Sequence, residues 1–291
     1  MWYYAFYAGL IATLGALVFQ LVRLGAMAMM RRTVAATSAG SVTLATTGEA
    51  PPWAGRLATF LTWVAVVCLS LSLLFRVIAT GRPPYSNMWE FLVAFGWVGL
   101  LTYALFSRRY PHPAIGAAAL LLVTALLVVP EVLFSSAISP LVPALQNNRL
   151  LGIHVALLLL AYGVLGIAFA AAVLYLVQAH GRRLAALPSL DTLDDLGYRA
   201  VIVGFPLLAA GVALGAYWGN IAWGRYWGWD PKETTALVTW LMFAGYLHAR
   251  GLARWRGKRA AWLIVLGFAV IIFNIFAVNF WIAGLHSYAG A

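Results

Sequence analysis

The side chains with the most chemical potential in this sequence are five histidines and the aromatic rings of one tryptophan-rich stretch. The histidines are His112, His154, His180, His248 and His286. Imidazole nitrogens ligate transition metals, and they also form ordinary hydrogen bonds. The sequence has one cysteine, Cys68, which excludes a disulfide framework, a CxxC redox pair and a thiolate metal site. Any redox or metal chemistry here therefore depends on histidine and on a bound cofactor.

The tryptophan-rich stretch spans residues 217–235 and reads YWGNIAWGRYWGWDPKETT. Its indole rings belong to Trp218, Trp223, Trp227 and Trp229. One interpretation is an aromatic belt at a membrane surface. A second is a loop that forms a platform for a large flat ligand, because glycines separate the rings and allow the backbone to approach a ligand closely. Asp230 and Pro231 are expected to cap and begin the helix that follows.

The composition is that of a membrane protein. Of the 291 residues, 64% are hydrophobic and 9% are charged, and the mean hydropathy is +0.89. A soluble domain carries about 25% charged residues, so a soluble enzyme is excluded. The formal net charge is +11, but the basic residues fall in short clusters between apolar runs. Such clusters orient membrane helices and do not form a nucleic-acid-binding face.

Apolar runs long enough to cross a membrane, which takes about 20 helical residues, occur repeatedly along the chain. They lie at 2–22, 57–79, 89–107, 114–134, 151–177, 199–217, 233–249 and 260–281. The first run has no basic segment before it and no small-residue cleavage site after it, so we interpret it as a retained helix. The sequence therefore predicts an all-α polytopic integral membrane protein of about eight transmembrane helices, with residues 1–291 in a single membrane domain.

The distribution of basic residues predicts how the helices are oriented. The connections after the first, third, fifth and seventh runs hold most of the arginines, as in Arg108 and Arg109 and in the segment 250–259. By the positive-inside rule these connections are cytoplasmic, and both termini are extracytoplasmic. The stretch 217–235 then lies on the outer side.

The motif at 223–234 resembles the tryptophan-rich "WWD" signature of the haem-handling proteins of cytochrome c biogenesis. The continuation Pro-Lys-Glu-Thr after Asp230 is similar to the CcsA (ResC-type) family of System II cytochrome c synthetases. Other segments that resemble this family are GRPPYSNMWEF at 81–91, HAR at 248–250 and GLHSYA at 284–289. Together they cover roughly residues 80–291, and the WWD motif is highly specific.

The resemblance implies roles for particular residues. Haem b, the group to be attached, would contact the aromatic stretch and be ligated through axial histidines. His154 and His286 match the outer ligands of the haem iron, and His248 matches the transmembrane histidine that binds haem on its way out. A second transmembrane ligand is expected from a separate CcsB/ResB-type subunit. The residues of the stretch assigned to haem binding are Trp218, Trp223, Tyr226, Trp227, Trp229 and Asp230.

The remaining polar residues have simpler interpretations. His112 and His180 fall among arginines and are interpreted as solvated cytoplasmic residues. Arg76 is a charge near the outer end of the second apolar run. It is interpreted as snorkelling to the membrane surface in preference to pairing with a haem propionate. Glu90 begins the third run, where a carboxylate favours the helix dipole.

The function that the resemblance implies is that of a haem lyase of the holocytochrome c synthase type. The protein would receive haem in the plasma or inner membrane, or in a thylakoid, and present it outside for thioether attachment to the CxxCH segment of apocytochrome c. No catalytic residue beyond those that position haem is expected. One alternative is a haem exporter or chaperone of the CcmC type. Another is a cytochrome b-like electron carrier, which would need two histidine pairs. A transporter would predict broken helices or repeats near the midplane, and the sequence has neither.

Overall fold

The computed structural model describes residues 1–37, 51–138, 149–180, 184, 186–280 and 282. Within these residues the regular structure is entirely helical. The helices are α1 (Trp2–Thr37), α2 (Pro52–Thr80), α3 (Met88–Phe106), α4 (Pro113–Leu133), α5 (Arg149–Ala179), α6 (Leu190–Trp223), α7 (Pro231–Gly251) and α8 (Lys258–Phe280). Seven of them, all but α7, are long and apolar enough to cross a membrane. The expected all-α, multi-pass membrane fold is confirmed.

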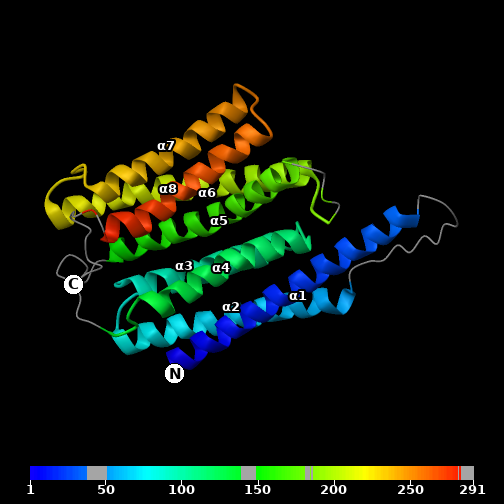
Figure 1. Ribbon diagram of the computed structural model, residues 1–291. Coiled ribbons are helices and arrows are strands. Elements are labelled where there is room, and N and C mark those ends of the chain that lie inside the picture. Colours follow the sequence, from blue (N-terminus) through cyan, green and yellow to red (C-terminus); the bar gives the residue numbers. More distant parts are fainter. Residues whose placement is uncertain (38–50, 139–148, 181–183, 185, 281, 283–291) are drawn as a thin grey trace.

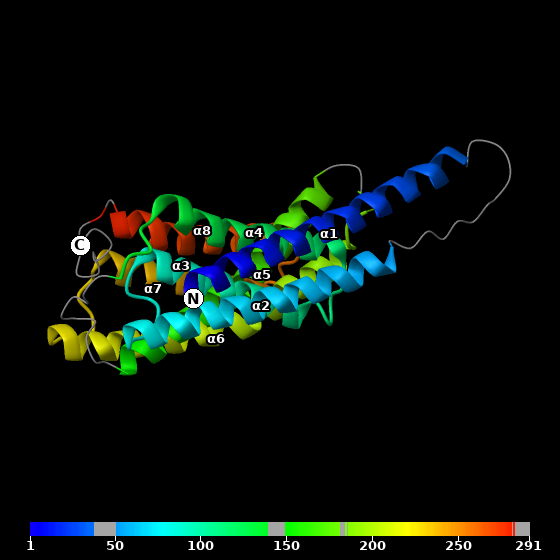
Figure 2. The ribbon, with the colours of Figure 1, turned by 90° about the horizontal axis from the view of Figure 1, so that it is seen from below.

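The helices run alternately up and down and form two groups of four (Figure 1). Helices α1 to α4 contact one another in one group, and α5 to α8 contact one another in the other. The groups meet where α5 packs against α3 and α4. Turned by 90°, the bundle shows all its helices running along one common direction, with α1 reaching beyond the others at one end (Figure 2). This topology brings the starts of α3, α5 and α7 and the ends of α6 and α8 to the same end of the bundle.

Several helices are longer than the apolar runs that predicted them. α6 has 34 residues, about 51 Å at the helical rise, which exceeds the ~30 Å hydrocarbon core. The prediction that this helix ends near residue 217 is too short, because α6 extends to Trp223. α6 continues through Gly219 to Trp223, and it ends at Gly224, whose φ of 73° closes a left-handed cap. Only residues 224–230 connect α6 to α7.

Helices α5 and α6 approach closely because glycines face α5 along one side of α6. A Cβ added at Gly211 would lie 2.7 Å from Leu158, and one at Gly215 would lie 2.4 Å from His154. Side chains at these positions would force the helices apart, and such small-residue contacts are a common way to pack helices in a membrane. The spacing of these glycines along α6 therefore fixes how α5 lies against it.

Arg76 and Glu90 form a buried ion pair, which neither of their separate interpretations from the sequence predicted. Arg76 does not snorkel, because its side chain is fully buried and its Nε donates to Glu90 Oε1 at 2.8 Å. The guanidinium lies over the rings of Trp2 and Trp89, with centroid distances of 4.4 and 5.1 Å. A charge at this depth is stabilised by an opposite charge and by ring faces where water is absent. Glu90 therefore does more than favour the helix dipole.

Glu90 also anchors the segment that leads into α3. Its Oε2 accepts hydrogen bonds from the Ser86 backbone N–H at 2.9 Å and from the Ser86 hydroxyl at 2.6 Å. Asn87 caps α3 by accepting from the Glu90 backbone N–H at 2.8 Å. A second carboxylate, Glu131 of α4, accepts from the Tyr7 hydroxyl and from Trp89 Nε1. These bonds join α1, α2, α3 and α4 at the same end of the bundle.

We expect Glu90→Gln to destabilise the protein strongly, because it leaves the Arg76 guanidinium buried without its counter-charge. Removing one partner of a buried pair typically costs about 3–5 kcal/mol. The thermal midpoint in detergent, followed by circular dichroism, measures this. The matched control is Arg199→Gln, which removes one partner of the exposed Arg199–Asp195 pair, and we expect no measurable shift there. Equal midpoints for both variants would contradict the structural role of the buried pair.

Candidate functional site

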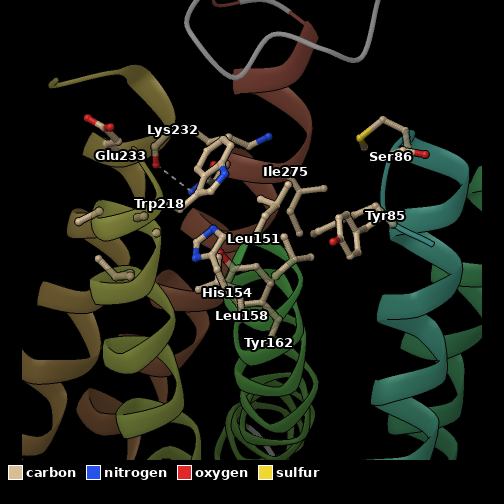
Figure 3. A pocket seen from close by; sticks show the side chains of 18 of the residues that line it. Tyr85, Ser86, Leu151, His154, Leu158, Tyr162, Trp218, Lys232, Glu233 and Ile275 are labelled. Carbon is tan, nitrogen blue, oxygen red and sulfur yellow. Dashed lines mark hydrogen bonds between the residues drawn. The ribbon is translucent and has the colours of Figure 1, made fainter. Parts of the chain in front are cut away.

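A cavity of about 1260 Å³, counted with its open mouth, lies at the end of the bundle where α5 and α7 begin. One wall is the segment before α3 together with the start of that helix, from Tyr85 to Phe91. The other walls come from the parts of α5, α6, α7 and α8 at this end of the bundle and from Trp227 in the connection before α7. The cavity therefore lies between the two groups of helices, and most of its lining is apolar or aromatic (Figure 3).

His154 projects from α5 into this cavity (Figure 3). Its Nδ1 lies 2.7 Å from the backbone carbonyl oxygen of Gly211 on α6. A carbonyl oxygen can only accept, so this contact favours the tautomer with the proton on Nδ1 and the lone pair on Nε2. Metal-binding histidines commonly hold their second nitrogen in this way, which fixes the ring and its tautomer. The contact with α6 therefore holds the His154 ring in place and favours Nε2 as its unprotonated nitrogen.

The other histidines of the described chain lie away from the cavity. His112 precedes α4, and its Nδ1 accepts from the Ala114 backbone N–H at 3.2 Å, so it caps that helix. His180 is exposed just after α5, and His248 is exposed near the end of α7. All three belong to the opposite end of the bundle. His286 lies outside the described residues.

The aromatic residues of the predicted stretch divide into two groups. Trp218 and Trp227 line the cavity, and Trp218 is only 2% exposed. Trp223 packs edge-on against Trp218 with ring centroids 4.7 Å apart, so it supports that ring from behind. Trp229 is 69% exposed and Tyr226 is 56% exposed, and neither lines the cavity. The structure thus brings two of the assigned rings to the cavity and leaves two on the surface.

The connection before α7 is fixed by a capping box. Asp230 accepts from the Lys232 backbone N–H at 3.0 Å, and Glu233 Oε2 accepts from the Gly228 and Asp230 backbone N–H groups at 2.8 and 3.1 Å. The expected capping role of Asp230 is confirmed. Trp229 adopts a φ of 54°, an uncommon conformation for a residue with a side chain. The two carboxylates therefore hold a strained turn that places Trp227 over the cavity.

Sequence reasoning did not single out several residues of the cavity. Tyr85 forms the wall opposite His154, and burial raises the pKa of its hydroxyl to about 12. Lys232 lies in the first turn of α7, outside the seven spanning helices, and burial lowers the pKa of its ammonium to about 8. Tyr162 and Asn274 also line the cavity. For Tyr85 the available signal was the GRPPYSNMWEF segment, and for Lys232 it was the Pro-Lys-Glu-Thr continuation.

The arrangement is suited to binding a large, flat and mostly apolar ligand that brings a metal with it. Within the described residues no cluster of three or more His, Cys, Asp or Glu side chains could hold a bare metal ion. One oriented imidazole among aromatic rings fits a metal that is already held by a macrocycle, as in haem. Glu233 also lines the cavity, but its carboxylate is engaged by backbone N–H groups. The lining thus favours binding and orientation over acid–base chemistry.

Comparisons with known proteins identify relatives over most of the chain. Residues 85–286 match the family described as Cytochrome C assembly protein. The cytochrome c biogenesis protein CcsA of Guillardia theta is 40% identical over 255 residues, which are 78% of this chain and 83% of that protein. CcsA of Pyropia yezoensis is 35% identical over 278 residues, 80% of this chain and 87% of that protein. CcsA of Synechococcus sp. (strain RCC307) is 35% identical over 274 residues, 83% and 87% respectively.

A solved structure shares the fold. The cytochrome c haem lyase CcmF superposes with a TM-score of 0.62 and 21% sequence identity. The match covers 94% of this chain and 46% of that chain. The helical arrangement is therefore similar over nearly the whole sequence, while this chain spans about half the length of CcmF.

We expect Gly215→Ala to displace the His154 imidazole, because the new methyl group would lie 2.4 Å from its Cε1. Overpacking of this kind costs about 1–3 kcal/mol. In a His154→Ala background the methyl group has room, so the same substitution should cost much less. Thermal midpoints of the two single variants and the double variant measure this coupling. Gly245→Ala, at a position with open space around it, is the control. An equal cost of Gly215→Ala in both backgrounds would show that the contact with His154 does not matter.

Proposed function

Because this chain belongs to the Cytochrome C assembly protein family and acts in cytochrome c biogenesis, we propose that it is a haem lyase-type subunit of a cytochrome c synthetase. In this proposal it receives haem b and holds it in the cavity at the end of the bundle. It then presents the haem to the CxxCH segment of an apocytochrome c. Haem is thus a substrate of this protein and not a resident cofactor.

The observation that carries the proposal is the His154 imidazole in an aromatic cavity. Its Nδ1 lies 2.7 Å from the Gly211 carbonyl oxygen. In the proposal this contact leaves Nε2 to ligate the haem iron. The indoles of Trp218 and Trp227 line the same cavity. Ring faces and apolar side chains stabilise a porphyrin by burying its surface, at roughly 25 cal/mol per Å². Trp223 and Asp230 act indirectly, by supporting Trp218 and the connection before α7.

The proposed reaction is addition of two substrate thiols to the two vinyl groups of haem. Each thiol forms one C–S bond to a vinyl carbon, and its hydrogen goes to the neighbouring carbon of the same double bond. The addition is balanced without an oxidant or reductant. The chain itself contributes proximity and orientation, which can account for a large part of a bimolecular barrier. No general base of the protein is required in this scheme.

Two further ligands belong to the proposal. His286 follows α8, which ends beside the cavity, and we assign it the second axial position of the outer haem. His248 lies at the other end of α7, on an exposed stripe with Val238, Leu241 and Gly245. We assign this stripe to a CcsB/ResB-type partner subunit that supplies a second histidine. Haem would then enter there before it reaches the outer cavity.

The orientation in the membrane is proposed from the basic residues. The end opposite the cavity carries the arginine-rich connections, including Arg108, Arg109 and Arg254 to Arg259, which the positive-inside rule places in the cytoplasm. The cavity and both termini are then extracytoplasmic, in a plasma or inner membrane or in a thylakoid. Apocytochromes are exported before haem is attached, so this is the side on which the substrates would meet.

We expect His154→Ala to lower haem bound per protein by at least about tenfold, a loss that even an outer-shell partner of a metal ligand commonly causes. Cytochrome c yield should fall with it. Added imidazole that reaches the vacated position should restore part of both. The absorption spectrum of the purified protein and the haem-stained cytochrome yield measure the two effects. His180→Ala, exposed at the other end, is the matched control.

Two results would count against this assignment. Full cytochrome c maturation in the His154→Ala strain without imidazole would show that His154 is not a required ligand of the haem iron. Haem that stays bound in a His154-dependent way, while attachment proceeds normally in cells lacking the protein, would indicate a haem chaperone and not a synthetase.

The orientation predicts the activity of fused reporters. Green fluorescent protein inserted between Arg250 and Arg259 should fluoresce, because this connection is expected in the cytoplasm. Alkaline phosphatase fused after residue 291 should be active, because the C-terminus is expected outside. Paired alkaline phosphatase and green fluorescent protein fusions measure both sides. A phosphatase that is active between Arg250 and Arg259 would reverse the orientation and place the cavity on the wrong side for exported apocytochromes.

A further inference from the structure

Lys232 occupies a distinctive place in the cavity. It lies in the first turn of α7, and its side chain extends past Trp218 toward the space above His154 (Figure 3). Among the described lining residues it carries the one ammonium group. Charged side chains that face the interior of a membrane protein commonly mark the site or the path of a substrate.

The carboxylates next to Lys232 in sequence are directed to the helix cap. Asp230 accepts from the backbone N–H of Lys232, and Glu233 accepts from the backbone N–H groups of Gly228 and Asp230. Glu233 lines the cavity, but its Oε2 is held by these two backbone N–H groups. The start of α7 also carries the positive end of a helix dipole. Lys232 and the positive end of the α7 dipole therefore supply positive charge at this edge of the cavity, beside the carboxylates of Asp230 and Glu233.

We propose that the Lys232 ammonium binds a propionate carboxylate of haem and so sets how the ring lies in the cavity. The inference rests on the proposed function, because it requires haem above His154. A charge-assisted bond between an ammonium and a carboxylate is strong where water is limited. Lys232 acts here as a positioning and specificity residue and not as a catalytic one.

This contact has a consequence for the reaction. In haem the vinyl groups lie on the edge opposite the propionates. Lys232 comes from α7, whereas Tyr85 and Ser86 form the wall on the far side of the cavity (Figure 3). A propionate held at Lys232 therefore turns the vinyl edge toward the Tyr85–Met88 segment. The substrate thiols would approach from that side.

The test compares haem with its dimethyl ester, in which both carboxylates are neutral. Binding of each porphyrin to the purified full-length protein is measured by absorption titration, for wild type, Lys232→Met, Lys232→Arg and Lys258→Met. Lys258 is an exposed lysine at the start of α8, at the opposite end of the bundle, and is the matched control. Thermal midpoints confirm that each variant is folded.

We expect wild type and Lys258→Met to prefer haem over the diester by about tenfold or more, the range for a hydrogen bond to a charged group. Lys232→Met should lose this preference by weakening haem binding only, with diester affinity unchanged. Lys232→Arg should keep a part of it. If Lys232→Met retains the preference, or weakens both ligands equally, the proposal is wrong.

Two other outcomes separate this inference from the function on which it rests. If wild type binds haem and the diester equally, and the spectrum of each depends on His154, haem binding is supported and the propionate contact is excluded. Binding of a lipid phosphate by Lys232 would give this result. If neither porphyrin binds in a His154-dependent way, the proposed function and this inference both fail.

Discussion

The structure depends on the close approach of α5 and α6. Gly211 and Gly215 leave room for α5 side chains, and the approach brings the His154 ring against a backbone carbonyl oxygen of the neighbouring helix. A carbonyl in the middle of a helix normally accepts from four residues further on, and here it also contacts an imidazole. The ring is thereby fixed by the backbone and not by a flexible side chain. The His154 ring is therefore held as rigidly as the two packed helices themselves.

The cavity lies between the two four-helix groups at one end of the bundle. On one side, the buried Arg76–Glu90 pair holds Ser86 and the segment leading into α3. On the other, the Asp230–Glu233 capping box holds the short connection before α7. Both walls are fixed by carboxylates that bind backbone N–H groups, so neither depends on a ligand to form. Pre-formed walls reduce the ordering cost of binding a large rigid molecule.

The sequence was most informative where the bilayer dictates the pattern. Apolar runs predicted the number and order of the helices, and Asp230 and Pro231 predicted where α7 begins. The end of α6 was predicted several residues early, because aromatic residues through Trp223 remain compatible with a helix until Gly224. Which indoles face the cavity could not be predicted, since Trp218 faces it from α6, which was expected to end earlier, and the direction of Trp227 depends on the turn at Trp229. The burial of Arg76 was missed because its partner, Glu90, is on another helix. Lys232 stood next to a recognised motif, but only the packing of α7 against α8 shows that it reaches the cavity.

In the proposed complex, haem lies in this cavity with its iron on His154, between Trp218 and the wall formed by Tyr85. A cryo-electron microscopy map of the full-length protein loaded with haem tests this most directly. We expect planar porphyrin density above the His154 ring, continuous with Nε2, with a propionate beside Lys232. Haem density at another part of the bundle, with the His154 ring still against the Gly211 carbonyl oxygen and no porphyrin above it, would show that this cavity is not the haem site.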